Sequence, residues 1–247
     1  MKKELAYGPL LLIVFWYLIC WTRIINPLFL PSPHVVLAEL GRLLLTSTMW
    51  LDIGWTLGRI LAGFLMAAII GIPFGLLMGQ SPKVYAASEV LLDFFRSLPA
   101  LAIFPLLMFV FGIGDAAKIA TTVFGCSLVM AINAYYGVVH SRKTRKLVAE
   151  LMEATPFEIF VKVTLMDALP QVFIGMRTSL SLAIVIIVVT EMFVGTNFGI
   201  GHRIFEAQLT YRVPEMYASI TLAGLLGYGL NKAFVAFEKN IVHWSGK

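Results

Sequence analysis

The chain has 247 residues, of which 59% are hydrophobic and only 13% charged, and its mean hydropathy is +0.86. A soluble domain of this length would expose far too much apolar surface, so the composition excludes that class and indicates an all-α polytopic membrane protein. The net charge of +5 is typical of basic loops that orient such a protein. Because the chain has no long basic face with interleaved aromatic residues, we expect no nucleic-acid binding.

The N-terminal region is predicted to hold one membrane span and one interfacial helix. Residues 9–25 are apolar over most of the roughly 20 residues that cross a bilayer. Two nearby prolines then break the helix, and residues 35–45 form an amphipathic pattern that is expected to lie along the interface. We therefore divide the chain into residues 1–50, an N-terminal transmembrane helix plus a periplasmic interfacial segment, and a core of residues 51–240.

Five further spans are predicted, at residues 55–78, within 84–111, and at 116–139, 172–194 and 216–237. The first of them is punctuated by glycines at spacings that let helices approach closely in lipid. Pro99 and Pro105 are expected to kink the span within 84–111. The total is about six spans, and this even number predicts that both termini are cytoplasmic. The outer loop before the last span is expected to contain a short helix.

A polar segment of about residues 140–170 lies between the fourth and fifth spans. Charge is costly in a bilayer, so this segment should lie outside it. Four basic residues at positions 142–146 predict the cytoplasmic side by the positive-inside rule. Thr155 followed by Pro156, with Glu158 at the third position, is typical of a capped helix start. We predict two short helices with a break near residues 154–155, the second ending before Pro170.

The apolar residues of this segment recur every three or four positions, which is helical spacing. One interpretation is a solvated linker between two spans. A passive linker does not need the stripe formed by Phe157, Phe160 and Val163, however, and an apolar stripe on a loop is more often a contact surface. The segment is therefore predicted to dock a soluble cytoplasmic partner.

The order of these features resembles the membrane permease subunit of bacterial ATP-binding-cassette (ABC) importers, of the nitrate, sulfonate and taurine type. Each short motif is weak alone, but their order and spacing along nearly the whole chain make the resemblance specific. The motifs are Leu30-Pro31-Ser32-Pro33, Thr56-Leu57 with Arg59, Gly63-Phe64, Gly71-Ile72-Pro73, Gly75-Leu76-Leu77-Met78-Gly79, Arg96-Ser97-Leu98-Pro99, Phe104-Pro105-Leu106, Phe111-Gly112-Ile113-Gly114, Gly175-Met176-Arg177, Glu191-Met192 and Gly199-Ile200-Gly201. The resemblance implies the type I importer permease fold, with cytoplasmic coupling helices between spans four and five.

The same resemblance implies that the polar segment couples the permease to an ATPase. The coupling residues that it implies are Ala149, Glu150, Glu153, Ala154, Phe157, Phe160, Val163, Leu165, Pro170 and Gly175. The family motif begins Glu-Ala-Ala, which aligns here with Leu147-Val148-Ala149, and its glycine aligns with Glu153. Its first proline aligns with Met166, so three signature residues differ. This departure puts the strength of coupling in doubt and leaves open a diverged ATPase, a second, different permease or weakened coupling.

The resemblance also implies the partners and the location. These are two cytoplasmic ATPase subunits, a second permease copy or a paralogue, and a periplasmic or lipid-anchored substrate-binding protein, all at the bacterial cytoplasmic (inner) membrane. The sequence has no Gly-x-x-x-x-Gly-Lys-Ser/Thr loop, so ATP and magnesium are expected in the ATPase and no cofactor is expected on this chain. The implied solute is small and anionic, such as nitrate, a sulfonate or taurine.

Polar groups within predicted spans are the candidates for a substrate path, because such groups face a cavity or a partner by default. They are Arg96, Asn133, Ser179, Thr190 and Glu191. Arg96 either attracts an anion or is an interfacial arginine paired with Asp93 or Glu89. Glu191 either lies on the path or makes an interhelical hydrogen bond near the outer face.

Two other function classes are an enzyme and a stand-alone transporter or channel. The four histidines are scattered, and neither an HExxH nor a GxSxG motif is present, so no catalytic residue, metal site or enzymatic activity is expected. A stand-alone secondary transporter or channel remains the alternative to the importer. It would leave the docking segment without a role, and the spans show no inverted similarity.

Overall fold

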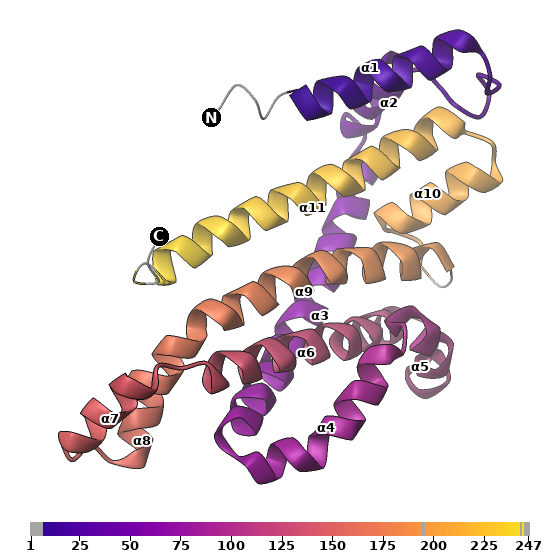
Figure 1. Ribbon diagram of the computed structural model, residues 1–247. Helices are drawn as coiled ribbons and strands as arrows, with labels where there is room; N and C mark the ends of the chain where they lie inside the picture. Colours follow the sequence, from indigo (N-terminus) through magenta and orange to yellow (C-terminus); the bar gives the residue numbers. More distant parts are fainter. Residues whose placement is uncertain (1–6, 194–195, 243, 245–247) are drawn as a thin grey trace. The chain divides into compact units, whose positions relative to one another are not determined.

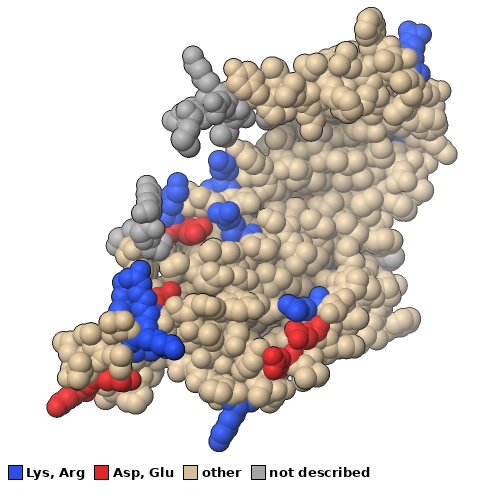
Figure 2. All heavy atoms as spheres, viewed as in Figure 1, with Lys and Arg blue, Asp and Glu red and all other residues tan. Residues whose placement is uncertain are grey.

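The computed structural model describes residues 7–193, 196–242 and 244 (Figure 1). Every regular element within these residues is helical. On the face seen in Figure 2, charged side chains are few and uncharged residues dominate, as expected of a chain that lies largely in lipid. The chain divides into two compact units, within residues 1–56 and 191–226 and within residues 57–190 and 227–247. The predicted domain division near residue 50 stays a prediction.

The first unit contains α1 (Tyr7–Thr22), α2 (Pro33–Leu44) and α10 (Ile200–Leu209), together with the start of α3 (Ser47–Gln80) and of α11 (Val213–Ile241). The predicted amphipathic helix is confirmed as α2, which buries Val36, Leu40 and Leu43. On its exposed face the Arg42 Nε donates to the Glu39 carboxylate at 2.9 Å, and this bond lowers the pKa of Glu39. The short helix expected in the loop before the last span is α10.

The second unit is built around α6 (Asp115–Val139). Its other elements are α4 (Pro82–Ser97), the 3₁₀ turn η2 (Ala100–Ile103), α5 (Phe104–Phe111), α7 (Lys143–Leu151), α8 (Pro156–Ile159), the π-helical turn η3 (Phe160–Thr164) and α9 (Leu165–Phe193). Helix α6 packs against α4, η2 and α5. The predicted close approach of glycines is confirmed, since a Cβ at Gly75 would lie 2.1 Å from the carbonyl oxygen of Ala131 on α6.

The span predicted within residues 84–111 is bent next to Pro99, as one interpretation of the prolines expected, but the bend is a break between two helices and not a kink within one. Helix α4 ends at Ser97, and the segment after the break runs at 89° to it. Leu98 has extended backbone angles (φ −81°, ψ 125°), as is usual for the residue before a proline. Pro105 lies in the first turn of α5, where a proline favours helix initiation.

The expectation that the second short helix ends before Pro170 is wrong. Helix α8, η3 and α9 form one continuous run, Pro156–Phe193, with Pro170 inside α9. A proline removes only one helix hydrogen bond and is tolerated in helices that are surrounded by lipid or protein. The 29 residues of α9 suffice to cross a bilayer without α8 and η3.

The expected number of about six spans is approximate. Four described helical runs are long and apolar enough to cross a membrane, namely α3, α6, Pro156–Phe193 and α11. The bent pair formed by α4 and the segment Ala100–Phe111 makes a fifth if it is counted as one span. Helix α1 is apolar but shorter, with 16 described residues.

Candidate coupling surface

Two short helices and a tight turn form the polar segment between α6 and α9. The predicted break is confirmed, since α7 ends at Leu151 and α8 begins at Pro156. The capping box is present as well. The Thr155 hydroxyl accepts from the Glu158 amide at 3.3 Å, and the Glu158 carboxylate accepts from the Thr155 amide at 3.1 Å. These bonds close the first turn of α8 and fix the angle at which the chain enters it.

The Glu158 carboxylate also accepts from the Lys162 ammonium at 3.0 Å. The hydrogen bond from the Thr155 backbone amide, followed by that from Lys162, lowers the pKa of Glu158 from 4.5 to about 2. The carboxylate is therefore ionised under all physiological conditions. Its charge completes the helix start and neutralises that of Lys162.

Asp167 fixes α7 to the beginning of α9. Helix α7 has no side-chain cap of its own at Arg142, and the Asp167 carboxylate instead accepts from the Arg142 backbone amide at 3.1 Å. The same carboxylate forms an ion pair with Arg145 in the first turn of α7. A carboxylate near the positive end of a helix is favourable, so Asp167 acts as an N-cap from a distant element.

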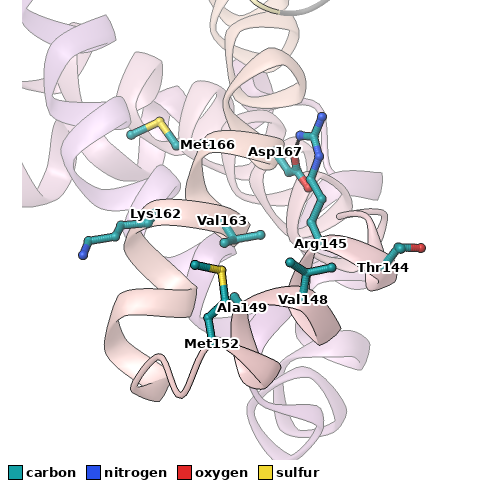
Figure 3. A pocket seen from close by; sticks show the side chains of 9 residues that line it. All are labelled: Thr144, Arg145, Val148, Ala149, Met152, Lys162, Val163, Met166 and Asp167. Carbon is teal, nitrogen blue, oxygen red and sulfur yellow. Dashed lines mark hydrogen bonds and ion pairs between the residues drawn. The ribbon is translucent and has the colours of Figure 1, made fainter.

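A pocket of about 370 Å³ lies between α7 and the η3–α9 segment (Figure 3). In Figure 3, Val163 lies opposite Val148 of α7 and Met152, which directly follows α7. Asp167 and Arg145 meet at one rim, and Lys162 points away on the other side. Its lining consists of Thr144, Arg145, Val148, Ala149, Met152, Lys162, Val163, Met166 and Asp167. The pocket is thus an apolar recess with charged groups at its edge.

Large apolar side chains are exposed around this recess. Leu151, Met152 and Phe157 are exposed by 84%, 77% and 74%, although they lie on a segment rich in charge. A second groove, of about 560 Å³, lies between the start of α8 and the end of α3, and its lining consists of Pro73, Leu76, Leu77, Gln80, Pro156, Phe157 and Phe160. Contiguous exposed apolar surface with a polar rim is typical of a protein interaction site.

The structure gathers nine of the ten predicted coupling residues on or beside this segment. Glu150, Glu153 and Phe157 are exposed, and the half-buried members are Ala149, Ala154, Phe160, Val163, Leu165 and Pro170. Gly175 is the exception, because it lies buried in α9, where a Cβ would be 2.5 Å from the Asn133 Cβ of α6. The sequence reasoning missed Asp167 as the residue that fixes α7. Asp167 lies too far along the chain from the uncapped start of α7 for the sequence to indicate this contact.

The five predicted substrate-path residues do not form one cluster. Ser179 and Thr190 are fully buried, and their hydroxyls donate to the backbone carbonyls of Cys126 and Ile186. The Asn133 amide oxygen accepts from Gln171 at 3.0 Å. Arg96 is exposed and paired with Asp93 at 3.2 Å, which agrees with the second of its two interpretations. A role of these residues in a path stays a prediction.

Glu191 belongs to a buried hydrogen-bond network in the first unit, and the predicted interhelical bond is present. Its carboxylate accepts from the Thr56 hydroxyl at 2.9 Å and from the Gly201 amide at 3.0 Å. The Ile200 amide donates to the Thr56 hydroxyl, and the Gly199 amide donates to Asp52. Gly199 has no side chain that could cap α10. The backbone amides at the start of this helix therefore donate to side chains of α3 and α9.

An ionic part of the same network was not anticipated. Arg203 on α10 pairs with Asp52 at 2.6 Å and with Glu215 at 3.1 Å, and both carboxylates are 4% exposed as side chains. The Gly-Ile-Gly start of α10 was the available signal. A helix that begins with glycines has no local cap and needs acceptors from elsewhere in the fold.

A family model described as "binding-protein-dependent transport system inner membrane component" matches residues 71–243. The chain belongs to this family. It is 30% identical to a probable ABC transporter permease protein of Brucella melitensis over 93% of this chain and 92% of the relative. The taurine transport system permease protein of Escherichia coli is 28% identical over 100% of this chain and 91% of the relative. A nitrate import permease protein of Synechocystis is 26% identical over 96% and 88%.

Among solved structures, the fold is similar to that of the MetNI methionine ABC transporter in an inward-facing conformation. The TM-score is 0.68, with 22% identity over 78% of this chain and 97% of the other. This likeness establishes the type I importer permease fold. The protein is thus a multi-pass transport subunit of an ABC importer in the inner membrane. Family membership implies a separate ATPase and a substrate-binding partner.

Proposed function

We propose that the recess between α7 and η3, with the exposed residues around it, is the surface on which the importer's ATPase docks. We name it the coupling surface, and it comprises Val148, Leu151, Met152, Phe157 and Val163. The observation that carries this proposal is the group of large apolar side chains exposed on a charged segment outside the spans. Such side chains need a protein partner to cover them.

The continuity of the helix from Pro156 to Phe193 supports a mechanical role for this surface. A partner that moves α8 would move α9 with it, because no break separates the two. Asp167 ties α7 to the same helix, so the segment moves as one body. ATP binding in the partner then changes the relative stability of two permease conformations, which any shift of population requires.

The finer assignments of the importer are part of the same proposal. The basic residues at positions 142–146 support a cytoplasmic location of this segment, and an even number of spans would put both termini on the same side. Two ATPase subunits hold ATP and magnesium, and a second copy of this chain or a paralogue completes the path, because one permease chain forms only one side of it. A periplasmic or lipid-anchored binding protein delivers the solute. The relatives named for taurine, sulfonates and nitrate support a small anionic solute or one that carries an anionic group.

The test is affinity purification of the tagged permease from its own membranes, with its co-expressed partners. The wild-type chain should recover a stoichiometric ATPase. Phe157→Asp and Val163→Asp should each reduce that recovery at least tenfold, because either change places a charge within the docked apolar surface.

The matched control is Tyr211→Asp. Tyr211 is an aromatic residue with 72% exposure, almost equal to that of Phe157, and it lies in the loop between α10 and α11. This variant should keep the ATPase. Recovery of no ATPase with the wild type, together with transport retained in vesicles, would overturn the proposal and favour a stand-alone transporter. Equal recovery with Phe157→Asp and Tyr211→Asp would place the docking surface elsewhere.

A further inference from the structure

Helix α4 carries charge on a segment that otherwise qualifies as part of a membrane span. Together with the segment Ala100–Phe111 it is long and apolar enough to cross a membrane as one bent span. Figure 2 nevertheless shows a short row of red and blue side chains over α4, surrounded by uncharged surface. The charged residues of α4 beyond its first turn are Glu89, Asp93 and Arg96, and Tyr85 shares their side of the helix. We call it the polar face of α4.

These four residues share one side of the helix, since they follow one another at intervals of four, four and three positions. No residue of α4 is buried, and both members of the Asp93–Arg96 pair are largely exposed. Val90 and Phe94, which are exposed apolar residues, lie on the other side. Hydrocarbon suits that second side, whereas exposed charge in a span belongs against water or a protein partner. Lipid is therefore excluded as the neighbour of the polar face.

The polar face borders a small cleft against α6. Its lining includes Glu89, Leu92 and Arg96 of α4 with Tyr135 and Tyr136 of α6, and its volume is about 50 Å³. Tyr85 stacks on Tyr135 with 4.5 Å between ring centroids. A cleft of this size holds a few water molecules, for which carboxylate and hydroxyl groups are suitable partners. Water can thus reach this side of α4.

The charges on this face do not cancel. The Asp93 carboxylate is paired with the Arg96 guanidinium at 3.2 Å. Within the described part of the chain, the Glu89 carboxylate instead accepts a hydrogen bond from the neutral Tyr85 hydroxyl, at 2.8 Å, and has no ion-pair partner. The face therefore carries one net negative charge, next to tyrosine rings that also attract cations. Charged side chains that line a narrow path determine which ions pass it.

We propose that the polar face of α4 lines the water-filled part of the solute path, and that Glu89 makes this part favour a solute with a positively charged group, such as an amine. The inference rests on the proposed importer function, and within it selects a solute with both an amine and an anionic group over a simple inorganic anion.

The test uses a cysteine reporter in the purified complex in lipid vesicles, with the native Cys20 and Cys126 replaced by alanine. Leu92→Cys places a thiol in the cleft beside Glu89, and Val90→Cys is the matched control on the other side of the helix. Each is reacted with two water-soluble thiol reagents of equal size, one bearing a trimethylammonium group and one a sulfonate. Ser88→Cys, a nearly isosteric change four positions before Leu92, is a second reporter if Leu92→Cys fails to fold.

Leu92→Cys should react about tenfold or more faster than Val90→Cys. Its ratio of reaction rates, cationic reagent over anionic reagent, should also exceed the same ratio measured for a free thiol in solution. Adding Glu89→Gln should return that ratio to the free-thiol value. If neither Leu92→Cys nor Ser88→Cys reacts with the reagents, with or without ATP, a second permease copy covers this face. If the rate ratio stays the same in Glu89→Gln, Glu89 causes no charge preference. Either result overturns the inference. Loss of the co-purifying ATPase from the wild-type sample is scored separately, and concerns only the proposed function.

Discussion

Replacing Thr56 by valine should destabilise the first unit severely, although the two side chains have nearly the same shape. Thr56 is fully buried, and its hydroxyl both donates to the Glu191 carboxylate at 2.9 Å and accepts from the Ile200 amide at 2.9 Å. Loss of a hydrogen bond to a charged group costs about 1.5–3 kcal/mol, and a buried amide left without an acceptor costs about 1–3 kcal/mol. The two costs together span about 2.5–6 kcal/mol, and the middle of this range, about 3–5 kcal/mol, is the expected loss in the free energy of unfolding.

The measurement is the melting temperature of the purified permease in detergent, followed by intrinsic fluorescence. For a chain of this length about 1 kcal/mol corresponds to 2–4 °C, so Thr56→Val should lower the melting temperature by roughly 6–20 °C. Ser219→Ala is the matched control. Ser219 is equally buried in the same unit, but its hydroxyl has no hydrogen-bond partner within the described part of the chain. Its removal should change the melting temperature by less than about 2 °C.

Thr56→Ser separates the hydroxyl from the methyl group. It keeps both hydrogen bonds and should cost only about 1 kcal/mol for the lost methyl. A melting temperature of Thr56→Val equal to that of Ser219→Ala would refute the reasoning, because it would mean that the hydroxyl at position 56 contributes nothing. The same would follow if Thr56→Ser and Thr56→Val lost equal stability.

Three further outcomes are expected in the segment between α6 and α9. Glu153→Gly should raise the free energy of unfolding by about 0.5–1 kcal/mol, because Glu153 has φ +58°, which glycine adopts without strain. Glu150→Gly, inside α7, is the control and should lower the free energy of unfolding by about 1 kcal/mol. Both changes are measured by thermal melting. The folded-state pKa of Glu158 lies below its unfolded value, so its stabilising contribution is complete above about pH 4.5 and is lost as the pH falls toward 2. The stability difference between wild type and Glu158→Gln should accordingly shrink between pH 5 and pH 3, and a difference that stays constant would contradict the lowered pKa. Asp167→Asn should keep the protein folded but reduce ATP-driven uptake severalfold in vesicles, and unimpaired uptake would show that fixing α7 is dispensable.

Local chemistry made much of the fold predictable from the sequence. The amphipathic period of α2 and the cap at Thr155 depend on residues within one or two turns, and both are confirmed. Glycines on α3 predicted close packing, but not the partner helix, which the structure identifies as α6. Patterns of this kind specify an element and its ends, because the interactions that stabilise them are close in sequence.

Features that depend on distant residues were not predictable in the same way. Arg203 and Asp52 are 151 positions apart, and nothing in either neighbourhood indicates that they pair. The prolines at the end of α4 predicted a disturbance of the helix but not its kind. The backbone of Leu98 decides between a kink and a break, and packing of η2 and α5 on α6 determines the direction taken after it.

Glu153, where the chain departs from the family's coupling motif, lies in the turn between α7 and α8. The resemblance aligns a glycine of the family motif with this position, and the backbone of Glu153 does adopt the left-handed conformation that favours glycine. The turn between α7 and α8 is therefore the same kind of turn, formed at the cost of local strain. The substitution leaves the apolar residues of the coupling surface in place and adds an exposed carboxylate at its edge. In the proposed docking the departure changes the charge that the ATPase meets, so a matching partner should carry a basic residue opposite Glu153.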